Sequence, residues 1–456
     1  MSLRRQPCQT IVVTGVGLVS SLGADRESVW GAVRKGASGV RSLAGLEGIP
    51  DHLLIGAPAD IAVEQPGQLK VIALAQRAAA EAIHDAQFDI PSLDLDRFGC
   101  AISGHMGDTG WVREHLGLPH PDGPDAVAWW RQWMPNTACT AVANHFGLAG
   151  PRLCHSTACA SGLIDVLAAM RAIQDGQCEM ALAGSADAFH PLFAAGFHAM
   201  KVLAHHADPR QACRPFDRGR NGFVMGEGAA MFVLERLDHA LARGARIYAE
   251  LCGGKLMGAA HHVTSVGECD ALAQLIRTSL QRAGCRPKDI EYINAHGTGT
   301  QQNDSLEIRG IRQALGRMAD RVLVSSSKSM LGHLVNAAGS VELAITILAL
   351  RDGFLPPTLN LTDPDPECDL DCIPLAGRRV PAETALKLSV AFGGHLAAVI
   401  VRRWSGKGAS RSPAYAPAFK RRPASIYGEE YGGSAAQTGG LRPARTATAV
   451  AHRHVG

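Results

Sequence analysis

Ser156-Thr157-Ala158-Cys159-Ala160-Ser161-Gly162 places one cysteine among small residues, directly before a long apolar stretch. In that stretch, residues 163–173, apolar side chains recur at helical spacing and alanines fill much of the rest. A helix that is apolar on most faces is a buried helix, so the sequence predicts one that begins just after Cys159. The N-terminus of a helix favours a thiolate, because its N–H groups are unpaired and the macrodipole is positive there. Small neighbours would let a substrate reach the sulfur, and N–H groups of the turn would stabilise a developing oxyanion.

A structural role for Cys159 is the competing interpretation. Free cysteine is among the most buried residue types, and most buried cysteines are inert. The surrounding residues alone support the two interpretations about equally. The choice therefore depends on the rest of the chain.

The composition is that of a globular protein with two or more domains or one large duplicated fold. The chain has 456 residues, of which 46% are hydrophobic and 19% are charged. Its formal net charge of +3 is too small to indicate binding to nucleic acid. Residues 405–456 hold eight basic and two acidic side chains, and serine, glycine, proline, alanine and arginine dominate them. We therefore expect residues 405–456 to form a disordered basic tail.

The twelve cysteines indicate neither disulfides nor a metal centre. They are scattered without a CxxC pair, and the chain starts with no signal-peptide pattern, so we expect reduced thiols in a cytoplasmic protein. The nineteen histidines include no HExxH or comparable ligand spacing, so no metal site is expected. No apolar run reaches about 18 residues, which argues against a membrane-spanning helix.

Apolar, strand-like runs alternate with helical patterns along the first part of the chain. The sequence predicts strands at residues 11–18, 98–104, 179–187 and 229–235, and helices at residues 26–36 and 69–86. Gly15-Val16-Gly17 lies in the turn after the first run, but no GxGxxG follows, so it does not indicate a dinucleotide site. Strands that alternate with helices predict an α/β fold whose sheets are covered on both faces.

A second strand-rich part begins near residue 291. In residues 292–300 a glycine-rich turn follows a strand, and residues 322–328 are strand-like. Residues 337–350 have a helical pattern, and the last strand is predicted at residues 388–403. After Trp404 the apolar periodicity disappears. The ordered part of the chain is therefore expected to end there.

Three further stretches have the composition of an active site. His296-Gly297-Thr298-Gly299-Thr300 follows a strand, Lys328 and His333 flank a short loop, and Phe392 precedes a glycine pair. Each stretch alone is a weak signal, because a single histidine is usually structural and a glycine pair is usually a turn. Their occurrence together and in this order gives them weight.

In this order the motifs resemble those of the β-ketoacyl-acyl carrier protein synthases, condensing enzymes of the thiolase superfamily. The shared sequences are Thr157–Gly162, Arg214–Asp217, Gly226–Gly228, Asn294–Thr300 with Asn303, Asp304 and Glu307, Lys328–Met330 with Gly332 and His333, Ala337–Gly339 with Glu342, and Phe392–Gly394. The resemblance runs from about residue 10 to 404 and is closest to the elongating type with a Cys-His-His active site.

The resemblance implies an α/β fold of the thiolase-like kind, a duplicated five-layered αβαβα sandwich. Its parts would be an N-terminal extension (1–10), a half with the nucleophile (11–250), a half with the His/Lys/His residues (251–404) and the tail (405–456). It further implies an acyl carrier protein as partner, substrates carried on phosphopantetheine, and no metal or other cofactor. Family members are usually homodimers, and heterodimers with a partner ketosynthase occur in polyketide systems.

The resemblance also implies a role for each catalytic side chain. Cys159 would hold the growing acyl chain as a thioester. Decarboxylation of malonyl-acyl carrier protein builds negative charge on the thioester oxygen, which His296 and His333 would stabilise with N–H donors. Lys328 would orient and polarise the histidines. The product would be 3-oxoacyl-acyl carrier protein and CO₂, in fatty acid, polyketide or specialised lipid biosynthesis.

Other residues would support this centre. The N–H groups of Cys159 and Phe392 would form an oxyanion hole, and the Phe392 ring would gate the acyl pocket. Glu307 is the candidate partner of Lys328, in a supporting network with Asp304. The side chains expected to contact pantetheine are Thr298, Thr300, Thr264 and Ser265.

The chain departs from the family pattern just before Phe392, where Leu388-Ser389-Val390-Ala391 replaces a more polar run. The family's structural cation lies near the positions of Asn294, Glu307 and Glu342, and an asparagine ligand for it is missing here. The sequence leaves open whether this chain binds that cation.

Two alternatives to an elongating enzyme follow from the same residues. One is a malonyl decarboxylase or a non-elongating partner subunit of a polyketide synthase heterodimer, against which the intact Cys159 argues. The other is a structural subunit, which would not need His296, His333 and Lys328. The motifs do not determine acyl chain length or pathway. Candidates for a basic surface that binds the acidic carrier protein are Lys201, Arg210 and Arg220.

Overall fold

The computed structural model describes residues 9–44, 53–88, 93–104, 127, 131–259 and 269–406, all within one compact unit, Met1–Ala414. The predicted tail from residue 407 onward and the N-terminal extension up to residue 8 lie outside the described residues. Among the described helices none is long and apolar enough to cross a membrane.

One ten-stranded sheet, order β11-β10-β14-β15-β9-β1-β8-β6-β4-β5, runs through the molecule. The first part of the chain supplies β1 (Ile11–Ser20), β4 (Phe98–Gly104), β5 (Arg152–Leu153), β6 (Met180–Asp187) and β8 (Gly228–Arg236). The second part supplies β9 (Ala249–Gly258), β10 (Tyr292–Asn294), β11 (Leu323–Ser325), β14 (Thr384–Ala391) and β15 (His395–Arg403). Short strands form two small sheets: β2 (Arg41–Ser42), β3 (Ile55–Ala57) and β7 (Met225–Gly226), and β12 (Phe354–Leu355) with β13 (Arg378–Arg379).

The two sets of five strands have the same topology. In the order β1-β8-β6-β4-β5, the first two pairings are antiparallel and the last two are parallel. The order β9-β15-β14-β10-β11 repeats this pattern pairing by pairing. Strands β1 and β9 join the two sets through Ile11–Val13 and Ala249–Leu251. The topology therefore shows the duplication that the resemblance implied, although the two halves share little sequence.

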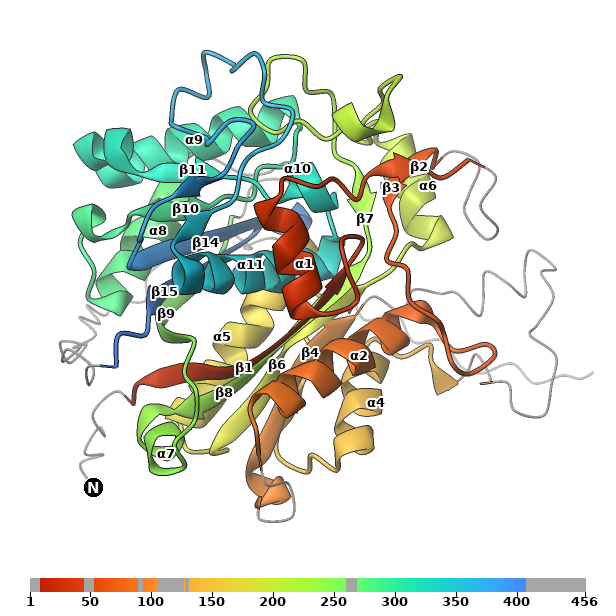
Figure 1. Ribbon diagram of the computed structural model, residues 1–456, viewed down its shortest axis with the longest axis vertical. Helices are drawn as coiled ribbons and strands as arrows, with labels where there is room; N and C mark the ends of the chain where they lie inside the picture. The colour runs from red at the N-terminus through yellow and green to blue at the C-terminus, as the bar shows by residue number, and fades with distance from the viewer. Residues whose placement is uncertain are drawn as a thin grey trace, which may run out of the picture. The chain divides into compact units, whose positions relative to one another are not determined.

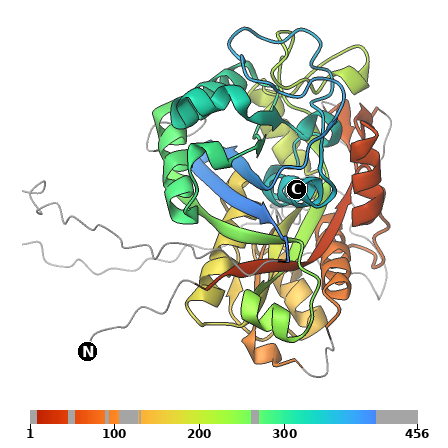
Figure 2. The ribbon, with the colours of Figure 1, turned by 60° about the vertical axis from the view of Figure 1, so that its left-hand side comes forward.

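Helices complete five layers. The helices are α1 (Arg26–Arg34), α2 (Lys70–Asp85), α4 (Thr137–Phe146), α5 (Ser161–Gln174), α6 (Pro191–Ala199), α7 (Leu237–Ala242), α8 (Cys269–Ala283), α9 (Gln301–Leu315), α10 (Lys328–Leu331) and α11 (Ala338–Asp352). Figure 1 shows α5 and α11 between the two sets of strands, with α2 and α4 outside one set and α8 and α9 outside the other. Figure 2 shows α8 and α9 beside the blue strands β14 and β15 from a second direction.

The central layer consists of two helices that are apolar nearly all round. Every residue from Ala338 to Leu350 in α11 is buried, and α5 is buried over most of its length. Their side chains form one core with residues from both sets of strands. The predicted buried helix after Cys159 is confirmed, and its N-terminus lies inside the molecule for this reason.

The predicted turn at Gly15-Val16-Gly17 is wrong, because both glycines lie inside β1, which continues to Ser20. A Cβ at Gly15 would overlap the carbonyl oxygen of Ala82, and a Cβ at Gly17 would overlap that of Ala78. Both carbonyls belong to α2, whose alanines face the strand. The motif thus permits close packing of a helix on a strand and has no part in phosphate binding.

Replacing Gly17 by alanine is therefore expected to lower the free energy of unfolding by about 1–3 kcal/mol, the usual cost of overpacking a core. Gly31→Ala is the matched control, because a Cβ at this position in α1 meets nothing within 4 Å. It should leave stability equal or higher by about 0.5–1 kcal/mol, since alanine favours a helix. Thermal or denaturant unfolding measures both. Equal stability of Gly17→Ala and the parent chain would contradict the close contact with α2.

The predicted last strand, residues 388–403, is wrong as a single element. The structure has two strands, β14 and β15, that pair antiparallel from Thr384↔Arg402 to Ala391↔His395. The chain reverses at Phe392–Gly394, where Gly393 and Gly394 have φ values of 80° and 74°. Only glycine adopts such values without strain, so the glycine pair makes the turn. The strand predicted at 322–328 also ends early, at Ser325, because Lys328 begins α10.

Candidate active site

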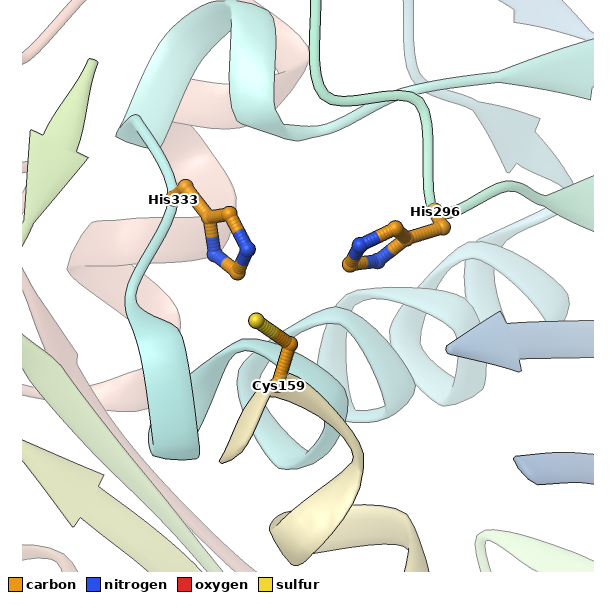
Figure 3. A group of neighbouring side chains, drawn as sticks. All are labelled: Cys159, His296 and His333. Carbon is orange, nitrogen blue, oxygen red and sulfur yellow. The ribbon is translucent and has the colours of Figure 1, made fainter. Parts of the chain in front are cut away.

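Three side chains from separate parts of the chain converge on one point. Cys159 lies in the 3₁₀ turn Ala158–Ala160 that leads into α5, His296 in the loop after β10, and His333 between α10 and α11. One ligand atom from each, the sulfur and a ring nitrogen of each histidine, lies within 4.8 Å of the others. Figure 3 shows the sulfur pointing between the two rings. The duplicated fold thus supplies the thiol from one half and both imidazoles from the other.

Burial dominates the electrostatics of Cys159. Its side chain is 5% exposed, and burial raises the pKa of the thiol to about 12, while the charge of Lys328 opposes this rise. Ala158, the preceding residue, has a φ of +46°, which is strained for a residue with a side chain. The cysteine lies at the N-terminus of α5, as predicted, and there burial, which favours the neutral thiol, opposes the helix N-terminus and Lys328, which favour the thiolate.

Hydrogen bonds determine which ring nitrogen of each histidine carries the proton. Nδ1 of His333 accepts the N–H of Val335 at 3.1 Å, which assigns the proton to Nε2. Nδ1 of His296 lies 3.4 Å from the Lys328 ammonium, which has only protons to donate, so the same assignment follows. The ring centroids are 5.3 Å apart and the ring planes are at 86°. Both imidazoles therefore offer an Nε2–H.

Both histidines are held neutral. Burial lowers the pKa of His296 and His333 well below the ordinary range, and the charge of Lys328 adds to this effect. Phe223 packs edge-on against His333, with ring centroids 5.1 Å apart. Neutral N–H donors in such a buried position can stabilise a developing negative charge with little competition from solvent.

Lys328 is fully buried, and the predicted pair with Glu307 is wrong. Its ammonium contacts Glu342 Oε1 at 2.5 Å and donates to the carbonyl oxygen of His296 at 2.6 Å. Glu307 instead accepts the N–H groups of His296 and Gly297 at 2.6 and 2.7 Å. The reason is position: α9 begins directly after this loop and directs Glu307 back beneath its backbone, whereas Glu342 projects from the buried helix α11.

Asp304 completes the support of the loop, as predicted. It accepts the N–H groups of Thr298 at 2.9 Å, Gly299 at 3.1 Å and Phe216 at 2.9 Å. Two buried carboxylates from the first turns of α9 thus hold the loop of residues 295–300, here called the His296 loop. Burial raises the pKa of both Asp304 and Glu307, and the hydrogen bonds from backbone N–H groups oppose this rise.

A second buried lysine, Lys387 in β14, was not predicted from the sequence. Its Nζ is 2.7 Å from Glu342 Oε2, so Glu342 bridges two lysines. Burial lowers the pKa of Lys387 to about 8, and the charge of Glu342 opposes this. The available signal was one charged residue inside the otherwise apolar or small run Thr384–Ala391.

A cavity of about 100 Å³ adjoins the three side chains. Besides them it is lined by Phe197, Val202, Phe223, Thr298, Thr300, Gln302, Asn303, Val390 and Phe392. The hydroxyls of Thr298 and Thr300 are 2.9 Å apart, and the Phe392 ring lies 6.3 Å from that of Phe197. The predicted Thr264 and Ser265 lie outside the described residues.

The three residues predicted to form a basic docking surface differ in their exposure to solvent. Arg220 is buried and paired with Asp365 at 2.5 Å, which removes it from any surface. Lys201 and Arg210 are exposed. Lys201 lines a second cavity of about 890 Å³ that shares Phe223 with the first. Lys201 and Arg210 therefore remain candidates for the basic docking surface.

Cysteine and histidine are also ligands for zinc, so the protonation of the ring nitrogens decides whether this group suits a metal. A metal needs a free lone pair on each ligating nitrogen. Nε2 of His333 carries its proton because Nδ1 accepts the Val335 N–H. The hydrogen bonding therefore suits donation to an oxyanion better than metal binding.

Comparison with known proteins agrees with this geometry. Residues 70–240 match the family model "Beta-ketoacyl synthase, N-terminal domain" and residues 248–362 match "Beta-ketoacyl synthase, C-terminal domain". The 3-oxoacyl-[acyl-carrier-protein] synthase 2 of Coxiella burnetii is 36% identical over 408 residues, covering 86% of this chain and 98% of the relative. The putative polyketide beta-ketoacyl synthase 1 of Streptomyces halstedii is 37% identical over 414 residues, covering 86% and 97%.

Solved structures of ketosynthases also match this chain. One match is the structure of a type II PKS acyl-carrier protein in complex with its ketosynthase bound to the hexaketide. It has a TM-score of 0.81 and 33% identity, over 88% of this chain and 100% of the matched chain. The ishigamide ketosynthase/chain length factor matches with a TM-score of 0.78 and 30% identity, over 87% and 99%.

Proposed function

Because this chain belongs to the β-ketoacyl synthase family, we propose that it extends an acyl group held on Cys159 by decarboxylative Claisen condensation with malonyl-acyl carrier protein. The observation that carries this proposal is the convergence of the thiol with two imidazoles within 4.8 Å. The products are 3-oxoacyl-acyl carrier protein and CO₂. The relatives include synthases named for acyl-carrier-protein substrates and for polyketides, and both pathways are open to the same chemistry.

The first step is transfer of the acyl group. The Cys159 sulfur attacks the thioester carbonyl, the bond to the pantetheine sulfur breaks, and the thiol proton ends on the departing pantetheine thiol. Negative charge on the carbonyl oxygen would be stabilised by the N–H groups of Cys159 and Phe392, whose turns lie side by side. The helix N-terminus of α5 stabilises the transient thiolate.

The second step is decarboxylation of the malonyl unit. Loss of CO₂ leaves an electron pair that spreads onto the thioester oxygen as an enolate. The Nε2–H groups of His296 and His333 would donate to that oxygen, and Lys328 would hold His296 in its tautomer. The enolate carbon then attacks the acyl carbonyl, and the Cys159 sulfur leaves as a thiolate and takes up one proton from solvent. The residues supply this chemistry without a redox cofactor.

The phosphopantetheine arm would enter along the cavity beside the Thr298 and Thr300 hydroxyls. Phe392, a half-buried wall of this cavity, would gate the acyl side. We place docking of the acidic carrier protein near Lys201 and Arg210, which are exposed basic residues in the region of the second cavity. A homodimer is the proposed assembly, and a heterodimer with a partner ketosynthase is the alternative.

A reconstituted assay tests the proposal. Purified chain, a panel of acyl-acyl carrier proteins and malonyl-acyl carrier protein should give 3-oxoacyl-acyl carrier protein with an equal amount of CO₂. Release of CO₂ without a 3-oxoacyl product would indicate the decarboxylase alternative. Absence of both, with a folded protein, would indicate a non-elongating partner subunit.

The lowered histidine pKa values predict a flat pH profile for decarboxylation. Because the pKa of each histidine lies well below its ordinary value, both rings stay neutral as the pH falls through that value. The malonyl decarboxylation rate of Cys159→Ala, in which the thiol no longer contributes, should therefore be constant between about pH 5.5 and 7, a range in which Lys387, with a pKa of about 8, also keeps its charge. A fall centred near pH 6.5, the ordinary histidine pKa, would contradict the buried neutral pair. Decarboxylation of malonyl-acyl carrier protein in buffer alone is the control.

A further inference from the structure

Lys387 is a fully buried cation that the reaction does not use directly. Its side chain is 0% exposed in β14, and lysine is almost never fully buried unless it is paired. The cost of removing an ammonium from water is high, so its contacts must offset that cost. Those contacts show what the side chain does.

Four oxygen atoms surround the Lys387 ammonium. They are the backbone carbonyls of Asn294 at 3.4 Å, Ala295 at 3.2 Å and Leu388, together with Glu342 Oε2 at 2.7 Å. Carbonyl and carboxylate oxygens are the ligands that hard metal cations prefer. Lys387 therefore lies in a donor set of the kind that binds a metal cation, with its ammonium at the position of the ion.

This neighbourhood is where the family resemblance implies a structural cation, near Asn294, Glu307 and Glu342. The residues of this chain do not fit such an ion. The ammonium already occupies the carbonyl and carboxylate oxygens, and it would repel a second positive charge at contact distance. Leu388 offers only its backbone oxygen, where the family pattern has a polar run.

We propose that the Lys387 ammonium replaces the structural cation, joining β14 to the His296 loop through Glu342 and the backbone carbonyls. The consequence reaches the active site through Glu342. Its Oε2 pairs with Lys387 and its Oε1 with Lys328, which contacts Nδ1 of His296 at 3.4 Å. Lys387 is thus a positioning residue that acts through Glu342 and Lys328.

The effect on His296 rests on the proposed function, whereas the replacement of the ion does not. The first test therefore measures thermal unfolding of the full chain in potassium, sodium and tetramethylammonium chloride at equal ionic strength. The wild-type melting temperature should be the same in all three salts. A saturable rise in potassium or sodium would show that an ion binds beside Lys387 and would overturn the proposal.

A double variant, Lys387→Ser with Leu388→Asn, removes the ammonium and adds two oxygen ligands. Its melting temperature should be higher in potassium or sodium than in tetramethylammonium by about 2–4 °C, because an ion that binds only the folded state stabilises it. Lys288→Ser, at an exposed lysine, is the control and should respond to no particular cation. A folded double variant that is indifferent to the cation would overturn the proposal. If the double variant does not fold, the wild-type salt comparison still decides.

The positioning role of Lys387 is tested by the rates of decarboxylation and of Cys159 acylation. In tetramethylammonium chloride the double variant should decarboxylate malonyl-acyl carrier protein about 10-fold or more slowly, because His296 is displaced, and potassium or sodium should restore the rate. Acylation of Cys159 should be affected much less. Equal losses in both steps would contradict positioning through His296. Because the melting experiments need no substrate, failure of the proposed function leaves their result intact.

Discussion

Replacing Cys159 by alanine is expected to abolish condensation while malonyl decarboxylation continues. Removing a covalent nucleophile eliminates the acyl-enzyme route, so the rate of 3-oxoacyl formation should fall by roughly 10³-fold or more. The two histidines that would stabilise the enolate remain, since their positions depend on Lys328, Val335 and the His296 loop and not on the sulfur. The variant should therefore release CO₂ without forming a 3-oxoacyl product.

Intact-protein mass spectrometry after incubation with acyl-acyl carrier proteins measures the first half of this prediction. The parent chain should gain the mass of the acyl group, and Cys159→Ala should not. Cys154→Ala is the control, because Cys154 is a partly exposed cysteine outside the cavity. An acyl adduct that persists in Cys159→Ala would assign the nucleophile to another residue.

Replacing His333 or His296 by alanine should have the opposite effect on the two reaction steps: decarboxylation should slow while acylation of Cys159 continues. Each change removes one N–H donor to the enolate oxygen, and loss of such a donor typically lowers the rate by about 10²–10³-fold. Decarboxylation and condensation should fall by this factor. Acylation of Cys159 should be affected much less, because that step depends on the sulfur and on backbone N–H groups.

The double variant His296→Ala, His333→Ala sharpens the test. If the two donors act on one oxygen as a unit, the combined loss should be smaller than the product of the single losses. His84→Ala, on the exposed side of α2, is the control and should match the parent chain. Acylation that falls as much as decarboxylation in the single variants would indicate that the histidines serve the first step.

The active site could be predicted where a residue's chemistry and its local sequence were enough. A small-residue turn before an apolar helix placed Cys159 at a buried helix N-terminus, and the structure confirms that position. The prediction that Glu307 pairs with Lys328 was wrong, because sequence spacing does not show which of two buried carboxylates faces an ammonium. The glycine pair after Phe392 is typical of a turn, yet residues 388–403 were predicted as one strand, and only the structure shows that the chain reverses there between β14 and β15.

By itself, the sequence determined the α/β class, the buried helix after the cysteine and the residue types of the group Cys159, His296 and His333. These depend on apolar periodicity and on short motifs, which are local properties of the chain. Only the tertiary structure decided that the two halves repeat one topology and that Glu342 bridges Lys328 and Lys387. Lys387 and the carbonyl oxygen of Asn294 are 93 residues apart in sequence, and burial brings them together. A buried charge takes its partners from whatever the fold packs around it, so those partners have no signature in the local sequence.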